Sequence, residues 1–310
     1  MTTDDRLRIL ICIGGGPDAY AGLKYAARLS KQSCAHITLL YVRPTDSGLK
    51  SGGMEMRVAR ENVLDWGLEL PGMTHLKAAR DILIELGEIS DDQKTEWRHR
   101  ELSGDHADEY RIEYENSCGA VISLKLRTAE DITSAVADEA ARFNADLIVV
   151  GASPEPMAGL KRLLSAKPLA LRIAAICKRS IIVARHLEPG HGLLVCVQDT
   201  DRSRAMLPEA VRYARACQCP VSILSVAPTE ADLPGAQKAV AETETAFTKA
   251  GITPTETLVE IGDPVATIIT IGYDFSLIVA SESLKPWFAK GFSVSHEVAR
   301  QARNSVMIVK

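Results

Sequence analysis

Hydrophobic and polar positions follow the same order in two parts of the chain. Each part opens with a short apolar run, continues with apolar residues three and four positions apart, and reaches a second apolar run. The middle pattern predicts an amphipathic helix and the flanking runs predict strands. The matched segments are 8–14 with 192–198, 18–32 with 202–216, and 36–42 with 221–226.

The repeat continues further along the chain. The run over 145–151 corresponds to 275–281, and the run over 179–185 corresponds to 304–310. These runs are apolar on consecutive residues, which is typical of strands buried on both faces in a parallel sheet flanked by helices. Each half therefore predicts alternating strands and helices, which is the doubly wound α/β plan.

The spacing of the repeat locates an insertion. Leu10 corresponds to Leu194, an offset of 184, whereas Leu147 corresponds to Leu277, an offset of 130. The first half is therefore longer by 54 residues, and we place the inserted segment at about 45–118.

A turn-rich linker, Pro189-Gly190-His191-Gly192, predicts the domain boundary. We expect a first domain over 1–187 and a second over 192–310.

The inserted segment contains both helical and strand-like patterns. A stretch of small residues opens it, and an alternating pattern predicts a β-hairpin added to the strand at 120–126. The hairpin is interpreted as a solvated flap or pairing edge, or else as a ligand lid or partner surface. The predicted helices are 54–68 and 74–86, and the strand-like runs are 95–102, 109–115 and 120–127.

Composition is that of an ordinary globular protein. The 310 residues suffice for about two domains, with 46% hydrophobic and 25% charged residues. The net charge of −4 provides no general attraction to nucleic acid or anionic lipid. The polar first eight residues do not resemble a signal peptide, and no apolar run approaches the ~20 residues of a membrane span.

Seven cysteines are scattered without a CxxC pair, and several lie in apolar runs as buried thiols do. We therefore expect reduced cysteines and a cytosolic protein. Cys217 and Cys219 form a CxC, a spacing that rarely completes a metal site or a disulfide.

Several short motifs now resemble one family. The order is ILICIGGG (9–16), ADLIVVGAS (145–153), GLKRLLSA (159–166) and KRSIIVAR (178–185). The second half adds LLVCVQD (193–199), Glu260-Ile-Gly-Asp-Pro264 and SVSHEVARQARNSVMIV (293–309). Together they resemble the universal stress protein (UspA-like) domain in its tandem form, over nearly all the chain except about 45–118.

The resemblance implies a fold and an arrangement. It implies two doubly wound parallel-sheet domains of the adenine nucleotide alpha-hydrolase-like, Rossmann type, packed as an internal pseudo-dimer. Their last strands, here 180–184 and 305–309, are expected to meet antiparallel.

One branch of the family binds adenine nucleotides, which makes ATP or another adenine nucleotide the cofactor to consider. That branch has an Asp after the first strand, which can accept a hydrogen bond from the adenine amino group. It also has a loop of form G-x2-G-x9-G-[ST] after the fourth strand. Its glycines let backbone N–H groups approach phosphates.

The present chain departs from that pattern. The Asp position is Gly14 in the first half and Gln198 in the second. At strict spacing the loop positions are Gly151, Pro154, Leu164 and Ser165 in the first half, and Ser281, Leu284, Val294 and Ser295 in the second.

The resemblance nevertheless yields two sets of candidate ligand-binding residues. Any ligand is expected first in the first half, although Pro154 and Pro156 stiffen its loop and remove amide donors. The first-half candidates are Gly14, Gly15, Gly16, Val42, Gly151, Ser153, Gly159 and Ser165. The second-half candidates are Gln198, Asp199, Ser281, Ser283, Gly291, Ser293 and Ser295.

Other groups of residues have plainer readings. Gly14–Gly16 fits a tight strand-to-helix turn, and Lys161-Arg162 fits the solvated face of a helix as well as an anion contact. Trp287-Phe288 is interpreted as packing rather than as filling a phosphate site. His186 with His191 has no third metal ligand nearby. His99 and His106 lie with Asp105, Asp108 and Glu109, a group interpreted as an acidic hairpin tip rather than as a metal site. No hydrolase, metalloprotease or Walker motif occurs.

Three functions remain open at this point. The first is a cytosolic stress-response module that binds a small ligand or protein partners without turnover. The second is a slow ATP-hydrolysing protein, for which no general base is identified. The third is a ligand-free adaptor that uses the inserted hairpin. No catalytic residue, metal, nucleic acid or membrane partner is predicted, and homodimers are compatible with the pattern.

Overall fold

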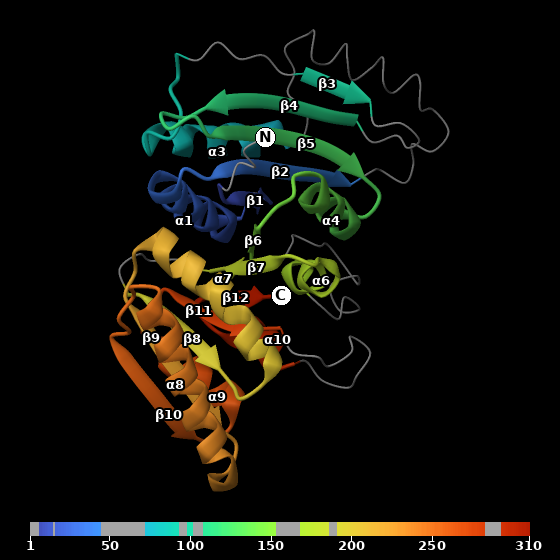
Figure 1. Cartoon of the computed structure of the whole chain (residues 1–310). Coiled ribbons are helices and arrows are strands. Elements are labelled where there is room, and N and C mark those ends of the chain that lie inside the picture. The colour runs from blue at the N-terminus through green and yellow to red at the C-terminus, as the bar shows by residue number, and fades with distance from the viewer. Residues whose placement is uncertain are drawn as a thin grey trace. The chain divides into compact units, whose positions relative to one another are not determined.

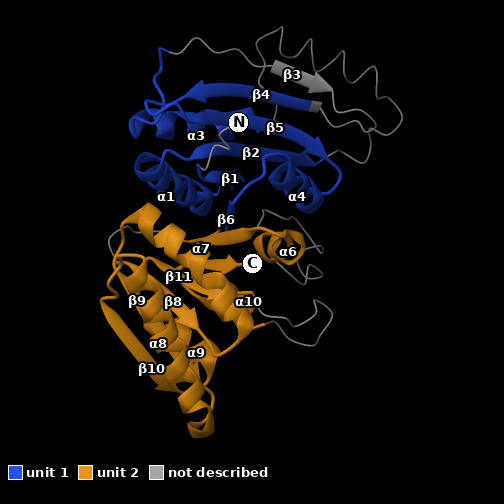
Figure 2. Ribbon diagram, in the orientation of Figure 1, with its two compact units in different colours: residues 1–151 blue, residues 152–310 orange. Residues whose placement is uncertain are grey.

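The computed structural model divides into two compact units, Met1–Gly151 and Ala152–Lys310 (Figure 2). It describes residues 6–14, 16–44, 72–92, 98–101, 108–152, 168–185, 191–282 and 293–310. The predicted helix over 54–68 lies outside these residues. Figure 1 shows strands and helices alternating along each unit. This confirms the predicted α/β class.

Unit 1 contains one mostly parallel sheet. Among its described residues the strand order is β6-β1-β2-β5-β4-β3. Its elements are β1 (Arg8–Cys12), α1 (Pro17–Ser33), β2 (His36–Pro44), α3 (Met73–Glu85), β3 (Arg98–Glu101), β4 (Asp108–Glu115), β5 (Val121–Ala129), α4 (Ile132–Arg142) and β6 (Leu147–Gly151).

The predicted hairpin is confirmed. Strand β4 pairs antiparallel with β5, and β3 pairs antiparallel with β4, whereas β5 pairs parallel with β2. The added strands thus extend the sheet of unit 1 beyond its parallel part.

Helix α3 has a different role from the one that the insertion suggested. It packs against α1, β2 and β5. In the same way α8 (Leu233–Lys249) of unit 2 packs against α7 (Asp201–Cys217), β9 (Val221–Ala227) and β10 (Glu256–Ile261). Because it lies in the crossover between two parallel strands, α3 belongs to the helical layer that both units share.

The two faces of the unit 1 sheet carry different helices. Lys125 of β5 forms an ion pair with Glu139 of α4, whereas the next residue, Leu126, lies beside Gly72 at the start of α3. Since successive side chains of a strand point to opposite faces, α3 and α4 cover opposite faces of the sheet.

Unit 2 begins with elements of the first repeat and continues with the second. Its strand order is β10-β9-β8-β11-β12-β7. The elements are α6 (Leu169–Ile176), β7 (Ser180–Ala184), β8 (Leu193–Val197), α7 (Asp201–Cys217), β9 (Val221–Ala227), a 3₁₀ turn (Glu230–Asp232), α8 (Leu233–Lys249), β10 (Glu256–Ile261), α9 (Pro264–Gly272), β11 (Leu277–Ser281), α10 (Val294–Gln301) and β12 (Ser305–Val309).

The last strands of the two repeats meet as expected. Strand β7 pairs antiparallel with β12, with Ile182 opposite Met307. All five residues of each strand are buried. The domain boundary predicted at 187–192 stays a prediction. The division into compact units falls instead before Ala152, so that β7 of the first repeat belongs to unit 2.

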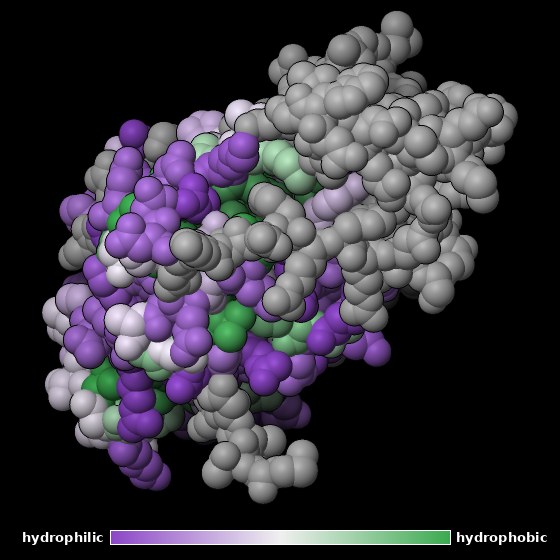
Figure 3. Space-filling view, turned by 90° about the horizontal axis from the view of Figure 1, so that it is seen from above, coloured by the Kyte–Doolittle hydropathy of each residue, from purple (hydrophilic) through white to green (hydrophobic). Residues whose placement is uncertain are grey.

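Hydrophilic residues dominate the described surface that Figure 3 shows, with hydrophobic residues visible in separate areas among them. None of the helices in the described ranges has the length and hydrophobicity that a membrane crossing requires.

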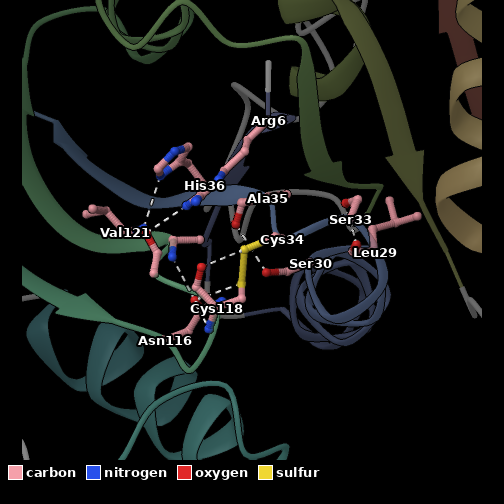
Figure 4. The surroundings of a disulfide bond; sticks show 12 residues. Arg6, Leu29, Ser30, Ser33, Cys34, Ala35, His36, Asn116, Cys118 and Val121 are labelled. Carbon is pink, nitrogen blue, oxygen red and sulfur yellow. Dashed lines mark hydrogen bonds between the residues drawn. A yellow bond between two sulfur atoms is a disulfide. The ribbon is translucent and has the colours of Figure 1, made fainter. Parts of the chain in front are cut away.

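A disulfide joins Cys34 to Cys118, 84 positions away in sequence (Figure 4). The expectation that all cysteines are reduced is therefore wrong for this pair. Cys34 caps the C-terminus of α1 and Cys118 lies in the β4–β5 turn. The two meet because β2 and β5 are parallel neighbours that begin two to three residues later, with Ile37 opposite Ile122.

Both sides of the disulfide have supporting hydrogen bonds of their own. The Asn116 side chain accepts from the N–H groups of Cys118 and Ala120, at 3.2 and 2.8 Å. The Cys34 N–H donates to the Ser30 carbonyl oxygen at 2.7 Å. The turn and the helix end are therefore formed without help from the sulfur atoms, and the disulfide adds a constraint on the chain between them.

We predict that the Cys34→Ser/Cys118→Ser variant folds but unfolds more easily. Removing a cross-link over a loop of this length costs about 4–5 kcal/mol in the chain-entropy model. Urea denaturation of the full chain, followed by hydrogen exchange of β2 and β5, measures the loss. Cys217→Ser, which changes a cysteine outside the disulfide, is the control. An unchanged midpoint in the double variant would contradict the prediction.

Candidate functional site

The carboxyl ends of β8, β9 and β11 surround a cavity of about 320 Å³ in unit 2. The sheet order changes direction between β8 and β11, because β8 leads to β9 on one side and β11 to β12 on the other. Such a switch point is where doubly wound sheets place their ligands.

The described lining of the cavity comes from three strand ends and the starts of three helices. Apolar side chains and one thiol form most of it, and the polar groups lie toward the loop ends. The lining residues are Cys196, Val197, Gln198, Thr200, Asp201, Arg202, Leu224, Val226, Pro264, Ile268, Ala280, Ser281, Glu282, Val294 and Ser295.

Side-chain caps begin the three helices at the cavity. Thr200 accepts a hydrogen bond from the Ser203 N–H in α7, and Asp263 accepts one from the Ala266 N–H in α9. Ser293 caps α10 in the same way. Each cap satisfies an amide that has no partner within its helix. The Gly262-Asp263-Pro264 motif thus supplies a cap followed by a proline at the first helical position.

An ionic pair joins two sides of the cavity. A guanidinium nitrogen of Arg202, at the start of α7, lies 3.4 Å from a carboxylate oxygen of Glu282, directly after β11. The Lys310 ammonium also binds the Glu282 carboxylate.

Three of the second-half candidates line this cavity. Gln198 follows β8, Ser281 ends β11, and Ser295 is 2% exposed in the first turn of α10. Ser293 is the neighbouring cap, and its hydroxyl oxygen lies 3.4 Å from that of Ser295. Ser283 and Gly291 lie outside the described residues.

Asp199 serves another purpose. Its carboxylate accepts hydrogen bonds from Arg204 at 2.6 Å and from Lys238 of α8 at 3.2 Å. Both hydrogen bonds lower the pKa of Asp199, and the one from Arg204 has the larger effect. The residue connects α7 to α8 and is absent from the described cavity lining.

The first-half candidates gather at the matching edge of unit 1. Gly14 follows β1 and is exposed, Gly16 precedes α1, and Val42 lies near the end of β2. Gly151 ends β6, next to β1 in the sheet. Gly15, Ser153, Gly159 and Ser165 lie outside the described residues, as do Lys161-Arg162 and Trp287-Phe288. The first-half site therefore stays a prediction.

Gly151 has a packing role in the structure. A Cβ atom there would lie 2.8 Å from the backbone nitrogen of Ala19 and 3.2 Å from its Cα. Glycine thus lets β6 approach the first turn of α1 closely. At the corresponding position of unit 2, Ser281 is accommodated.

Several lining residues were not among the sequence candidates. The offset of 184 relates Val226 to Val42 and Arg202 to Asp18, and the offset of 130 relates Glu282 to Ala152. Adding the offset of 184 to the candidate Val42 would have identified Val226. A search for glycines and phosphate loops has no reason to select Arg202 or Glu282.

No group of three or more His, Cys, Asp or Glu side chains arranged for a metal ion occurs within the described ranges. His106 and His186 lie outside these ranges, so the His99–His106 and His186–His191 pairs are not tested.

The comparisons with known proteins agree with this fold. A model of the universal stress protein family matches residues 6–183 and again 191–310. The chain therefore belongs to the universal stress protein family, with two copies of the domain in tandem. No curated protein matches the chain.

Solved structures share the fold over nearly the whole chain. A protein from Pseudomonas aeruginosa UCBPP-PA14, provisionally assigned to the universal stress proteins, is 13% identical, with a TM-score of 0.60 over 99% of this chain and 94% of that chain. A universal stress protein from Archaeoglobus fulgidus DSM 4304 is 14% identical, with a TM-score of 0.57 over 98% and 96%. These likenesses show that solved structures share the fold of this chain.

We predict that Gly151→Ala destabilises unit 1 by about 1–3 kcal/mol, because the added methyl group has only backbone to displace. Ser281→Ala, at the same place in the second repeat, is the matched control and is expected to change stability by less than about 0.5 kcal/mol. Thermal unfolding of the full chain measures both. Equal stability of the two variants would refute the packing role of Gly151.

The free cysteines should differ in reactivity. Burial raises the pKa of Cys196 to about 12 and that of Cys177 to about 11. A hydrogen bond from Cys217 lowers the pKa of Cys219. Since the thiolate is the reactive form, Cys219 carries more of it at a given pH.

We therefore predict that iodoacetamide at pH 7.5 labels Cys219 first and Cys196 and Cys177 last. Peptide mass spectrometry gives the order, and the same reaction in denaturant should remove the differences. Labelling of Cys196 in the folded protein as fast as that of Cys219 would show that the cavity thiol is not shielded.

Proposed function

We propose that this tandem universal stress protein is a cytoplasmic binding and regulatory module that responds to a small ligand held in the cavity of unit 2. The observation that carries the proposal is the cavity itself, at the switch point of a doubly wound sheet. Its volume of about 320 Å³ is at the small end of ligand pockets. Apolar walls with a few convergent polar groups are typical of such pockets.

The proposal modifies the preference drawn from sequence alone, which favoured the first half. Glycines directed attention to unit 1, whereas the described cavity is formed by strand ends of unit 2. The family resemblance makes adenine compounds the first ligands to test. Protein partners are part of the proposed role, and the net charge of −4 supports partners other than nucleic acid.

Calorimetric unfolding of the full chain with adenosine, AMP, cyclic AMP and ATP tests the proposal. A ligand that binds the native state stabilises it, by about 2.7 kcal/mol at 100 times its Kd. We expect at least one of these compounds, or the neutral fluorophore N-phenyl-1-naphthylamine, to bind and to raise the unfolding temperature.

A cavity-filling variant assigns any binding to unit 2. Ala280→Leu adds bulk to the lining and is expected to abolish the effect. Val150→Leu enlarges the side chain at the corresponding position of unit 1, outside this cavity, and should leave the effect in place. Absence of binding by all five probes, or binding unaffected by Ala280→Leu, would refute the proposed site. Release of phosphate from ATP would instead favour the hydrolysing alternative.

A further inference from the structure

We propose that the cavity of unit 2 takes an uncharged small molecule and discriminates against ligands that carry phosphate or another anionic group. This inference rests on the proposed function, that the cavity binds a ligand, and it names the class of that ligand. Four features of the described lining support it.

The first feature is the apolar wall. Val197, Leu224, Val226, Ile268 and Val294 are aliphatic residues of the described lining. A ligand that fills this space gains free energy by burying apolar surface of its own. The thiol of Cys196 is also part of the wall, and burial keeps it in its neutral form by raising its pKa.

The second feature is a set of neutral hydrogen-bonding groups. The Gln198 amide and the hydroxyls of Thr200, Ser281 and Ser295 belong to the lining residues. These groups match the donors and acceptors of an uncharged heterocycle or sugar. They supply no net charge to balance an anion.

The third feature is the balance of charge. The described lining contains the carboxylates of Asp201 and Glu282 and the guanidinium of Arg202. Arg204 pairs with Asp201, and Lys310 pairs with Glu282. The guanidinium of Arg202 is already engaged, because it contacts both the carboxylate and the backbone carbonyl oxygen of Glu282, each at 3.4 Å. Carboxylates therefore already engage these three cations, and an incoming phosphate must displace a carboxylate in order to pair with any of them.

The fourth feature is the use of helix N-termini. Helices α7, α9 and α10 all begin at the cavity, which is where free N–H groups can bind a phosphate. Here the cap side chains Thr200, Asp263 and Ser293 already accept from their first turns. Asp263 also places a carboxylate at the N-terminus of α9, where the helix dipole favours an anion. Pro264 has no N–H to donate.

The repeat shows what is particular to unit 2. In the first half the residues that correspond to Arg202 and Glu282 are Asp18 and Ala152. The first half therefore lacks a carboxylate directly after its fourth strand. The ionic pair across the cavity belongs to the second repeat alone.

Two fluorophores that differ by one charged group provide the test. N-phenyl-1-naphthylamine is neutral, and 8-anilino-1-naphthalenesulfonate is the same ring system with a sulfonate. Fluorescence titration of the full chain gives a Kd for each, and Ala280→Leu identifies the part of the signal that comes from the cavity. We expect the neutral probe to bind at least about tenfold more tightly than the anion.

Charge-neutralising variants then locate the cause. Glu282→Gln keeps the shape of the side chain. It should strengthen binding of the anion and so reduce the difference between the Kd values of the two probes several-fold. Asp201→Asn is a second variant at an exposed position of the lining. Glu244→Gln, on an exposed position of α8, is the control and should leave both affinities unchanged. Adenosine and AMP should follow the same order as the two dyes.

The outcomes separate the two proposals. Equal affinities of the neutral and anionic probes in the cavity would overturn the inference on ligand class and leave the binding function in place. The inference would also be overturned if neither Glu282→Gln nor Asp201→Asn reduced the difference between the Kd values of the two probes. Absence of any binding sensitive to Ala280→Leu would overturn the proposed function instead.

Discussion

The antiparallel pairing of β7 with β12 is the contact on which the organisation of this chain depends. The other strand pairs of unit 2 in the described residues are parallel. Without β7, the apolar strand β12 would lie exposed at the edge of the sheet. Such an edge is open to pairing with other chains. The final strand of the first repeat covers it, and the hydroxyl of Ser305 adds hydrogen bonds to the backbone N–H and carbonyl oxygen of Arg185.

The same pairing has a consequence for the cavity. The Glu282 N–H donates to the Val309 carbonyl oxygen, and the Lys310 side chain binds the Glu282 carboxylate. The end of β12 thus positions the acidic residue that lies across the cavity from Arg202. A strand contact that completes the sheet also determines the charge at the proposed ligand site, so that fold and specificity share one set of residues.

Much of the fold could be predicted because buried parallel strands leave a strong trace in sequence. Continuous apolar runs predicted the strands of both repeats, and the Gly262-Asp263-Pro264 motif marked the start of α9. The role of α3 was missed, because the whole segment 45–118 was interpreted as an insertion, although the offsets account for only 54 extra residues. One helix of the segment serves the common crossover. The Cys34–Cys118 disulfide was missed for a related reason. Its cysteines are distant in sequence and meet only through the register of β2 with β5.

The candidate site was predicted less completely. The repeated positions of Gln198, Ser281 and Ser295 were found, since each follows a predicted strand or begins a predicted helix. Asp199, a candidate one residue beyond Gln198, pairs through its side chain with Arg204 and Lys238 of the helical layer. Arg202 and Glu282 depend on each other across long sequence separation. No short sequence pattern predicts such a pair.

Cross-linking of β7 to β12 tests the central claim most directly. Ile182 and Met307 are register partners, so cysteines at these two positions lie within the reach of a disulfide in an antiparallel pair. We expect the full-length Ile182→Cys/Met307→Cys variant to form this bond within one chain on mild oxidation, detected by peptide mapping. The off-register variant Ile182→Cys/Val306→Cys should not form it. Failure of the first pair to cross-link, or equal yields from both, would contradict the account.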